Sequence, residues 1–88
     1  MVKELENAHY MTIMVGGFNK DQWRLTGLLN GNIVHTSTPV KFDKEKMTVT
    51  TFSGSVYRIA SISDHTTREK LIQYIEEDVA RSQENPNE

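Results

Sequence analysis

The chain has 88 residues, of which 36% are hydrophobic and 25% are charged, and its formal net charge is −2. A chain of this size can bury roughly 64% of its unfolded surface, which allows one small core and excludes a second domain. No apolar run approaches the length of a membrane-spanning helix, and the lack of cysteine excludes disulfides, thiolate zinc sites and a cysteine nucleophile.

The charge is distributed unevenly along the chain. Residues 1–60 carry seven basic and five acidic residues, a balance of +2, whereas residues 61–88 carry three basic and seven acidic residues, a balance of −4. Nucleic-acid binders usually show a clear basic excess, because phosphate contacts dominate their affinity. The acidic end therefore argues against tight non-specific DNA binding and against docking on an anionic membrane surface.

The first third of the chain predicts a single strand. Residues 1–8 are mostly polar and are expected to form a frayed start or a short helical turn. The apolar run 10–15 is short and is stopped by Gly16-Gly17, which favours a strand, although periodicity alone does not distinguish it from a buried helix. Residues 18–21 are expected to form a loop.

The next two predicted strands flank a strong hairpin signal. Residues 23–29 alternate in the sense of a strand, and residues 30–32 have the turn sequence Asn-Gly-Asn. The β pattern resumes over residues 33–42. Pro39 lacks an N–H and is expected at a bend, a bulge or a sheet edge of this segment.

Two turns compete within this hairpin. A type I′ turn at Asn30-Gly31 pairs Leu25 with Thr36, whereas a type II′ turn at Gly31-Asn32 pairs Leu25 with Thr38. The second register places more apolar pairs on one face of the hairpin, and we therefore prefer it.

The remaining strands follow at short intervals. Residues 43–46 predict a charged turn, and residues 47–52 are β-branched and alternating. The turn sequence Ser-Gly-Ser at 53–55 leads into the last strand, at 56–62.

The C-terminal part predicts one amphipathic helix. Thr66 and Glu69 fit a capping box, with Thr66 as the N-cap and Glu69 at position N3. The helix is expected to run to about Arg81, with Glu77 and Arg81 as a favourable i,i+4 pair. Four residues form its apolar stripe at helical spacing: Leu71, Ile72, Ile75 and Val79.

These elements predict an α+β fold, an antiparallel β-meander of about five strands with one C-terminal helix that covers an open side of the sheet. Closure into a small SH3-like or OB-like barrel is an alternative to an open sheet. We expect one domain over residues 1–82 and a disordered tail over 83–88. The absence of cysteine and of a recognisable leader predicts a cytoplasmic protein.

Catalytic and metal-binding patterns are absent from the sequence. His9, His35 and His65 do not stand at zinc-ligand spacing from one another, and no Gly-x-Ser-x-Gly elbow occurs. We therefore expect no enzyme activity, no metal and no cofactor, with a hydrolase or transferase built on His35 or His65 as a third hypothesis. The carboxylates offer no acid/base pair, because Asp43 and Glu45 lie in a turn.

Other polar groups have simpler structural explanations. The acidic residues Glu76, Glu77 and Asp78 are assigned to the polar side of the helix. Several threonines are expected to be strand formers on the exposed face of the sheet: Thr36, Thr38, Thr48, Thr50 and Thr51.

One region suggests a small-ligand site. The hydroxyl-bearing turn 53–55 is followed by Tyr57 and Arg58, and a guanidinium fork suits phosphate. Small β-barrels also bind single-stranded nucleic acid by stacking bases on aromatic residues within a basic groove. The candidate ligand-binding residues are Arg58, Tyr57, Ser53, Lys41, Trp23 and Arg24.

The leading hypothesis is a non-enzymatic interaction protein that binds and blocks or adapts a protein partner. A meander leaves edge strands that pair readily with another chain, and a homodimer or higher homo-oligomer would stabilise so small a domain. Met11, Met14 and Met47, with Phe18, could form an adaptable apolar patch. The alternative is a small binding module for a nucleotide or single-stranded nucleic acid on the sheet face, and no membrane partner is expected.

Overall fold

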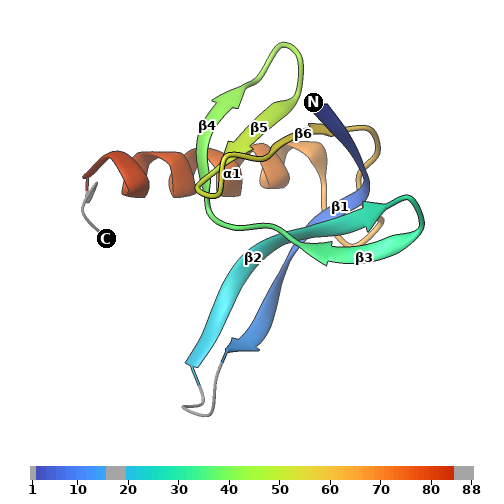
Figure 1. Ribbon diagram of the computed structural model, residues 1–88, viewed down its shortest axis with the longest axis horizontal. Helices are drawn as coiled ribbons and strands as arrows, with labels where there is room; N and C mark the ends of the chain where they lie inside the picture. The colour runs from blue at the N-terminus through green and yellow to red at the C-terminus, as the bar shows by residue number, and fades with distance from the viewer. Residues whose placement is uncertain (1, 16–19, 85–88) are drawn as a thin grey trace.

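The computed structural model describes residues 2–15 and 20–84, and this part of the chain forms six strands and one helix (Figure 1). The strands make one sheet in the order β3-β2-β1-β6-β5-β4, so the α+β prediction is confirmed. The strands are β1 (Val2–Val15), β2 (Lys20–Leu29), β3 (Asn32–His35), β4 (Pro39–Asp43), β5 (Thr48–Thr51) and β6 (Val56–Ile59), and the helix is α1 (Arg68–Glu84).

The sheet consists of two antiparallel meanders, β1-β2-β3 and β4-β5-β6, joined by parallel pairing of β1 with β6. Residues 2–5 of β1 pair with residues 56–59, and β1 pairs with β2 from Glu6 onward. The register shifts between Glu6 and His9, where Asn7 has a φ of 55°. This bulge bends β1, which allows one strand to belong to both meanders.

The strand pairing, the strand count and the start of the chain differ from the prediction. An antiparallel meander was expected, whereas the sheet is mixed because β1 and β6 pair in parallel. Six strands replace the five expected, because the segment 33–42 divides into β3 and β4. Residues 2–8, expected to be frayed or helical, belong to β1 because they pair with β6 more than fifty residues away. The sheet is open, with β3 and β4 at its edges, so a closed SH3-like or OB-like barrel is not confirmed.

The β2–β3 hairpin adopts the type I′ register, the less favoured of the two registers that the sequence allows. Thr36 donates its N–H to the carbonyl of Leu25 at 2.9 Å, as the Asn30-Gly31 turn requires. Asn30 and Gly31 have φ values of 53° and 83°, the left-handed conformation of a type I′ turn. The preferred type II′ register, which pairs Leu25 with Thr38, is therefore wrong. The conformational preference of the Asn30-Gly31 turn outweighs the additional apolar pairs that the other register would have formed.

Both later turns are confirmed. The Asp43 carboxylate accepts the N–H groups of Glu45 and Lys46 at 3.1 and 3.3 Å, which shapes the charged turn between β4 and β5. Gly54 donates its N–H to the Thr51 carbonyl at 2.9 Å and has a φ of 91°, a conformation that glycine adopts without strain.

The helix begins one residue later than predicted. The Thr67 hydroxyl accepts the N–H of Lys70 at 3.2 Å, and the Thr67 carbonyl accepts the N–H of Leu71 at 2.9 Å. Thr67 is therefore the N-cap in place of Thr66, and Lys70 occupies position N3 in place of Glu69. Since lysine has no acceptor, the reciprocal bond of a capping box is not available.

The end of the helix also lies beyond the prediction. α1 continues to Glu84, three residues past Arg81. Residues 85–88 of the predicted tail lie outside the described residues.

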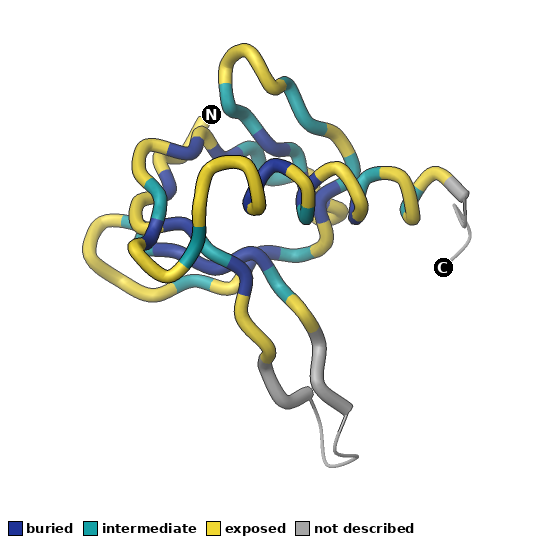
Figure 2. The backbone as a smooth tube through the Cα atoms, turned by 180° about the vertical axis from the view of Figure 1, so that it is seen from behind, coloured by how far each residue is buried: buried dark blue, intermediate teal, exposed yellow. Residues whose placement is uncertain are grey.

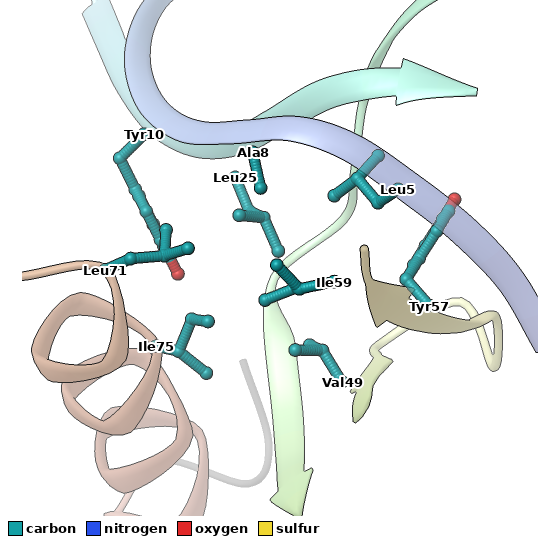
Figure 3. Close-up of a cluster of buried hydrophobic side chains, with 9 residues drawn as sticks. All are labelled: Leu5, Ala8, Tyr10, Leu25, Val49, Tyr57, Ile59, Leu71 and Ile75. Atoms are coloured by element: carbon teal, nitrogen blue, oxygen red, sulfur yellow. The ribbon is translucent and has the colours of Figure 1, made fainter. Parts of the chain in front are cut away.

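The hydrophobic core lies between α1 and one face of the sheet (Figure 3). Leu71 and Ile75 of the predicted helix stripe point at side chains from both meanders, which confirms that the stripe faces the sheet. The largest fully buried apolar side chains are Leu5, Leu25, Val49, Leu71 and Ile75.

Two threonines predicted to be exposed belong to the interior. Thr36 and Thr51 are 2% and 1% exposed. Each satisfies its hydroxyl with a backbone carbonyl, that of Ser37 at 2.9 Å for Thr36 and that of Ser55 at 3.3 Å for Thr51. Burial of a hydroxyl is tolerated because these bonds replace its bonds to water.

The most distinctive feature of the shape is a two-stranded projection, which we call the β1–β2 ribbon and define as residues 10–15 with 20–25. β3 pairs only with residues 26–29 of β2, and β6 pairs only with residues 2–5 of β1. Beyond the bridge from Ala8 to Ile62 and the bond from Thr36 to Leu25, β1 and β2 pair only with each other in the described part of the chain and extend away from the body (Figure 1).

Candidate protein-interaction site

The six predicted ligand-binding residues lie in four separate places, namely the sheet face opposite α1, the core, the β5–β6 turn and the β1–β2 ribbon. Arg58 and Lys41 share the face of the sheet opposite α1, because they pair with Thr48 and Thr50, whereas the intervening Val49 belongs to the core. Arg58 forms an ion pair with Glu4 across β6 and β1.

Tyr57 and Ser53 do not lie with Arg58 and Lys41 on this face of the sheet. Tyr57 alternates with Arg58 along β6 and is 8% exposed, packed within the core. The Ser53 hydroxyl lies 3.0 Å from that of Ser37 and 3.1 Å from that of Thr51, so it holds the β5–β6 turn against the connection before β4. The hydroxyl-aromatic-guanidinium arrangement expected around 53–58 is therefore not assembled.

Trp23 and Arg24 lie on the other half of the sheet, in the β1–β2 ribbon. Arg24 donates from Nη1 to the Thr36 carbonyl at 3.2 Å, which ties β2 to the chain that follows β3. Trp23 alternates with Arg24 and is 47% exposed.

Two of the three histidines have hydrogen-bond partners nearby, and the third lies at the surface. Nδ1 of His9 lies 2.9 Å from the Asn7 carbonyl, and Nδ1 of His35 lies 3.0 Å from the Thr26 hydroxyl. His65 is exposed before α1. Within residues 2–15 and 20–84, no three histidines or carboxylates gather closely enough to hold a metal ion.

Trp23 stands in a cluster of three aromatic rings at the root of the ribbon. Its ring stacks on Tyr10 of β1, with centroids 5.8 Å apart and planes at 27°. It meets Tyr74 of α1 edge-on, at 5.5 Å and 84°, and Tyr10 and Tyr74 are 5.4 Å apart. Such offset and edge contacts add stability beyond apolar burial, so the half-exposed indole is held on a rigid support.

A buried polar network fixes this support to the helix. The Tyr10 hydroxyl donates to Oδ2 of Asp78 at 2.7 Å, and Asp78 is 6% exposed. Arg81 pairs with Oδ1 of the same carboxylate. Burial, followed by the hydrogen bond to Asp78, raises the pKa of Tyr10 well above its ordinary value, so the phenol remains a donor at neutral pH.

Tyr10, Tyr74 and Asp78 were missed as site residues. The assignment of Asp78 to the polar side of α1 is wrong, because the carboxylate turns inward to Tyr10, and Arg81 pairs with Asp78 in place of Glu77. The i,i+4 spacing of Tyr74 and Asp78 was an available signal, since residues so spaced share one helix face. The third member, Tyr10, is 68 residues away from Asp78 in sequence, so helix spacing gave no sign of it.

The predicted methionine patch is not formed among the described side chains. Met11 is 40% exposed on the ribbon, whereas Met47 packs against the core beside the β4–β5 turn. The side chains of Met14 and Phe18 lie outside the described residues.

No family model matches this chain, and no significant match is found among curated proteins or solved structures. In the described part of the chain, no helix combines the length and the apolar character that crossing a bilayer requires.

Proposed function

We propose that this is a non-enzymatic interaction protein that binds and blocks or adapts a protein partner, and that the partner contacts the root of the β1–β2 ribbon around Trp23. The observation that carries the proposal is a tryptophan left 47% exposed on a support of two tyrosines. Tryptophan and tyrosine are enriched among the residues that dominate protein-protein binding energy.

The rigidity of the support favours binding over mere exposure. Trp23 has contacts on two sides, and Tyr10 is fixed in turn by Asp78. A side chain that is already ordered loses little conformational entropy when a partner covers it, so more of the contact energy becomes affinity. Its ring contacts Tyr10 of β1 and Tyr74 of α1, so a partner that covers it can also contact both of these elements.

The proposal is tested by comparative affinity purification from the source cells with three forms of the full chain. These are the unaltered protein, Trp23→Ala, and Phe52→Ala as a matched control that truncates a 71% exposed aromatic residue elsewhere. A partner that uses Trp23 should be retained by the first and third forms and lost by the second. Loss of an anchor worth 2 kcal/mol weakens binding about 30-fold.

Circular dichroism must show that the Trp23→Ala protein is folded. If the same proteins are captured at the same yield by all three forms, the ribbon root is not the binding surface. If Trp23→Ala alone loses a partner, the fluorescence of Trp23, the single tryptophan of the chain, can be used to follow the binding of that partner.

A nucleotide or single-stranded nucleic acid bound on the sheet face is the second candidate function. It is supported by the shared face of Lys41 and Arg58. A fluorescently labelled oligonucleotide should then bind with steep salt dependence, and Lys41→Ala with Arg58→Ala should weaken it. No binding at low salt would eliminate this alternative.

A further inference from the structure

The two long edges of the β1–β2 ribbon have no strand partner in the described part of the chain. On the β1 side, pairing with β6 ends at residue 5 and a last bridge joins Ala8 to Ile62. On the β2 side, β3 stops opposite Thr26, with one further bond from Thr36 to Leu25. Isolated two-stranded ribbons are at best marginally stable in water, so an additional strand would be favourable.

The backbone groups that face the β1 edge follow from the strand geometry. Ala8 donates its N–H to Ser61 and accepts the N–H of Ser63, so both of its polar groups point away from β2. Since the direction alternates along a strand, the N–H and C=O groups of Thr12 and Met14 point the same way. On the opposite edge, the Leu25 carbonyl points toward β3, so the polar groups of Asp21 and Trp23 point outward.

The two edges differ in charge. β1 contains no charged residue from position 10 to position 15, whereas β2 carries Lys20, Asp21 and Arg24 over the matching length. Charged residues on an edge strand oppose pairing with another chain. An uncharged run of β-formers without proline lacks this protection.

We propose that the β1 edge of the ribbon pairs with the same edge of a second copy of this chain, with residues 11–15 antiparallel to their symmetry copies about a two-fold axis near Ile13. Thr12 then stands opposite Met14 of the other copy. The pairing makes about four interchain backbone hydrogen bonds. It joins the two sheets into one continuous sheet across the dimer.

Charge favours a second copy at the β1 edge of the ribbon over the β2 edge. A two-fold axis near Ile13 brings only uncharged residues together, with Met11 opposite Val15. The same operation on the β2 edge, about Gln22, would place Lys20 opposite Arg24 of the other chain, and like charges directly opposite destabilise a strand pair. A two-fold interface must be self-complementary, and the β1 edge meets this condition without bringing any charged residues together.

The decisive experiment uses proline, which removes an N–H donor. Met14 and Asp21 are opposite each other in the ribbon, and each directs its N–H away from its neighbour strand. Met14→Pro and Asp21→Pro therefore leave the β1–β2 hydrogen bonds intact while each removes a donor from one edge. Asp21→Pro is the matched control.

Sedimentation velocity of the purified chain is measured over about 1–200 μM, since a small interface predicts weak association. The unaltered protein and Asp21→Pro should form a species of twice the 10.1 kDa chain mass. Met14→Pro should raise the dimer dissociation constant at least about tenfold. A monomer over the whole range, or a Met14→Pro protein that dimerises like the unaltered chain, overturns the proposal.

Amide hydrogen exchange gives a second readout that does not depend on a variant being folded. In the unaltered protein, the N–H groups of Thr12 and Met14 should become protected as the concentration rises, whereas those of Asp21 and Trp23 should not. Protection of the β2 amides alone would assign the interface to the opposite edge and would refute the pairing. Because the readout is self-association of the purified chain, it is independent of whether Trp23 binds a partner.

Discussion

The β4-β5-β6 meander and the β1–β2 ribbon are built from the same kind of antiparallel pairing, yet they have opposite surroundings. The first has strands of four or five residues, and α1 covers one of its faces. The ribbon is formed by the ends of strands of fourteen and ten residues and extends beyond the body (Figure 1). The 17-residue helix is about 25 Å long and packs on core side chains of both meanders, including Tyr10 and Leu25 at the root of the ribbon, whereas the rest of the ribbon projects beyond it (Figure 1).

The comparison shows that stability and exposure are divided between two parts of one small sheet. The covered part of the sheet buries the apolar stripe of the helix (Figure 2). The ribbon keeps a half-exposed tryptophan and an uncharged strand edge, the two features on which binding is proposed. The aromatic cluster and the Tyr10–Asp78 bond connect the two parts.

Ile75→Asp should prevent α1 from packing on the sheet and should therefore unfold the protein. Ile75 is fully buried between α1 and the sheet, and a carboxylate there would be desolvated without a partner. The loss should equal or exceed the whole stability of a domain this small, about 5 kcal/mol. Circular dichroism should report an unfolded chain, whereas Gln73→Asp, on the exposed side of the same helix, should remain folded.

Gly27→Ala should loosen the place where β2 passes β1 at the base of the ribbon. A Cβ atom on Gly27 would lie 2.6 Å from Cγ of Leu5 and 2.8 Å from the Glu6 carbonyl. Relief requires movement of both strands, and we expect a loss of about 1–3 kcal/mol in urea unfolding. A Cβ atom on Gly31 would meet nothing within 4 Å, and only the φ of 83° disfavours a side chain there, so Gly31→Ala should lose less stability. Equal losses of stability for the two variants would contradict the close approach of β1 and β2 at Gly27.

Tyr10→Phe should remove the hydrogen bond that connects the ribbon to Asp78 of α1. Removal of the hydroxyl deprives the buried Asp78 of a donor and should cost about 1–3 kcal/mol at neutral pH. The pKa of Tyr10 is raised above its ordinary value of 10.0, chiefly by burial. The folded state therefore retains the proton longer than the unfolded state, so this contribution is complete below pH 10 and decreases as the pH rises above it.

The alkaline loss from this one group should be about 1.4 kcal/mol per pH unit above pH 10. Tyr10→Phe should lack this component, whereas Tyr74→Phe should retain it. Chemical unfolding at a series of pH values from 8 to about 11 measures the difference. Parallel curves for the unaltered protein and Tyr10→Phe would show that the Tyr10 proton is not linked to folding.

Arg58→Ala should have the smallest effect. Arg58 and Glu4 form an ion pair between exposed side chains on the face that α1 does not cover. Exposed pairs contribute about 0–1 kcal/mol, so the melting temperature should change by only a few degrees. A large destabilisation would mean that the uncovered face of the sheet is as important for folding as the covered one.

Local sequence patterns were sufficient to predict those helices, strands and turns that depend on residues close together in the chain. The period of Leu71, Ile72, Ile75 and Val79 predicted the face of α1 that packs on the sheet. The alternating segments and turn sequences predicted both later hairpins. The start of α1 was displaced by one residue and its end by three.

Features that depend on contacts between residues far apart in the chain could not be predicted from local patterns and are seen only in the folded structure. The parallel pairing of residues 2–5 with β6 turned an expected frayed start into the strand that joins the two meanders. The inward turn of Asp78 depends on Tyr10, which no local pattern relates to it. Trp23 was recognised as a candidate from its type, but the support that holds it comes from two other elements, because close packing brings together side chains that sequence spacing does not relate.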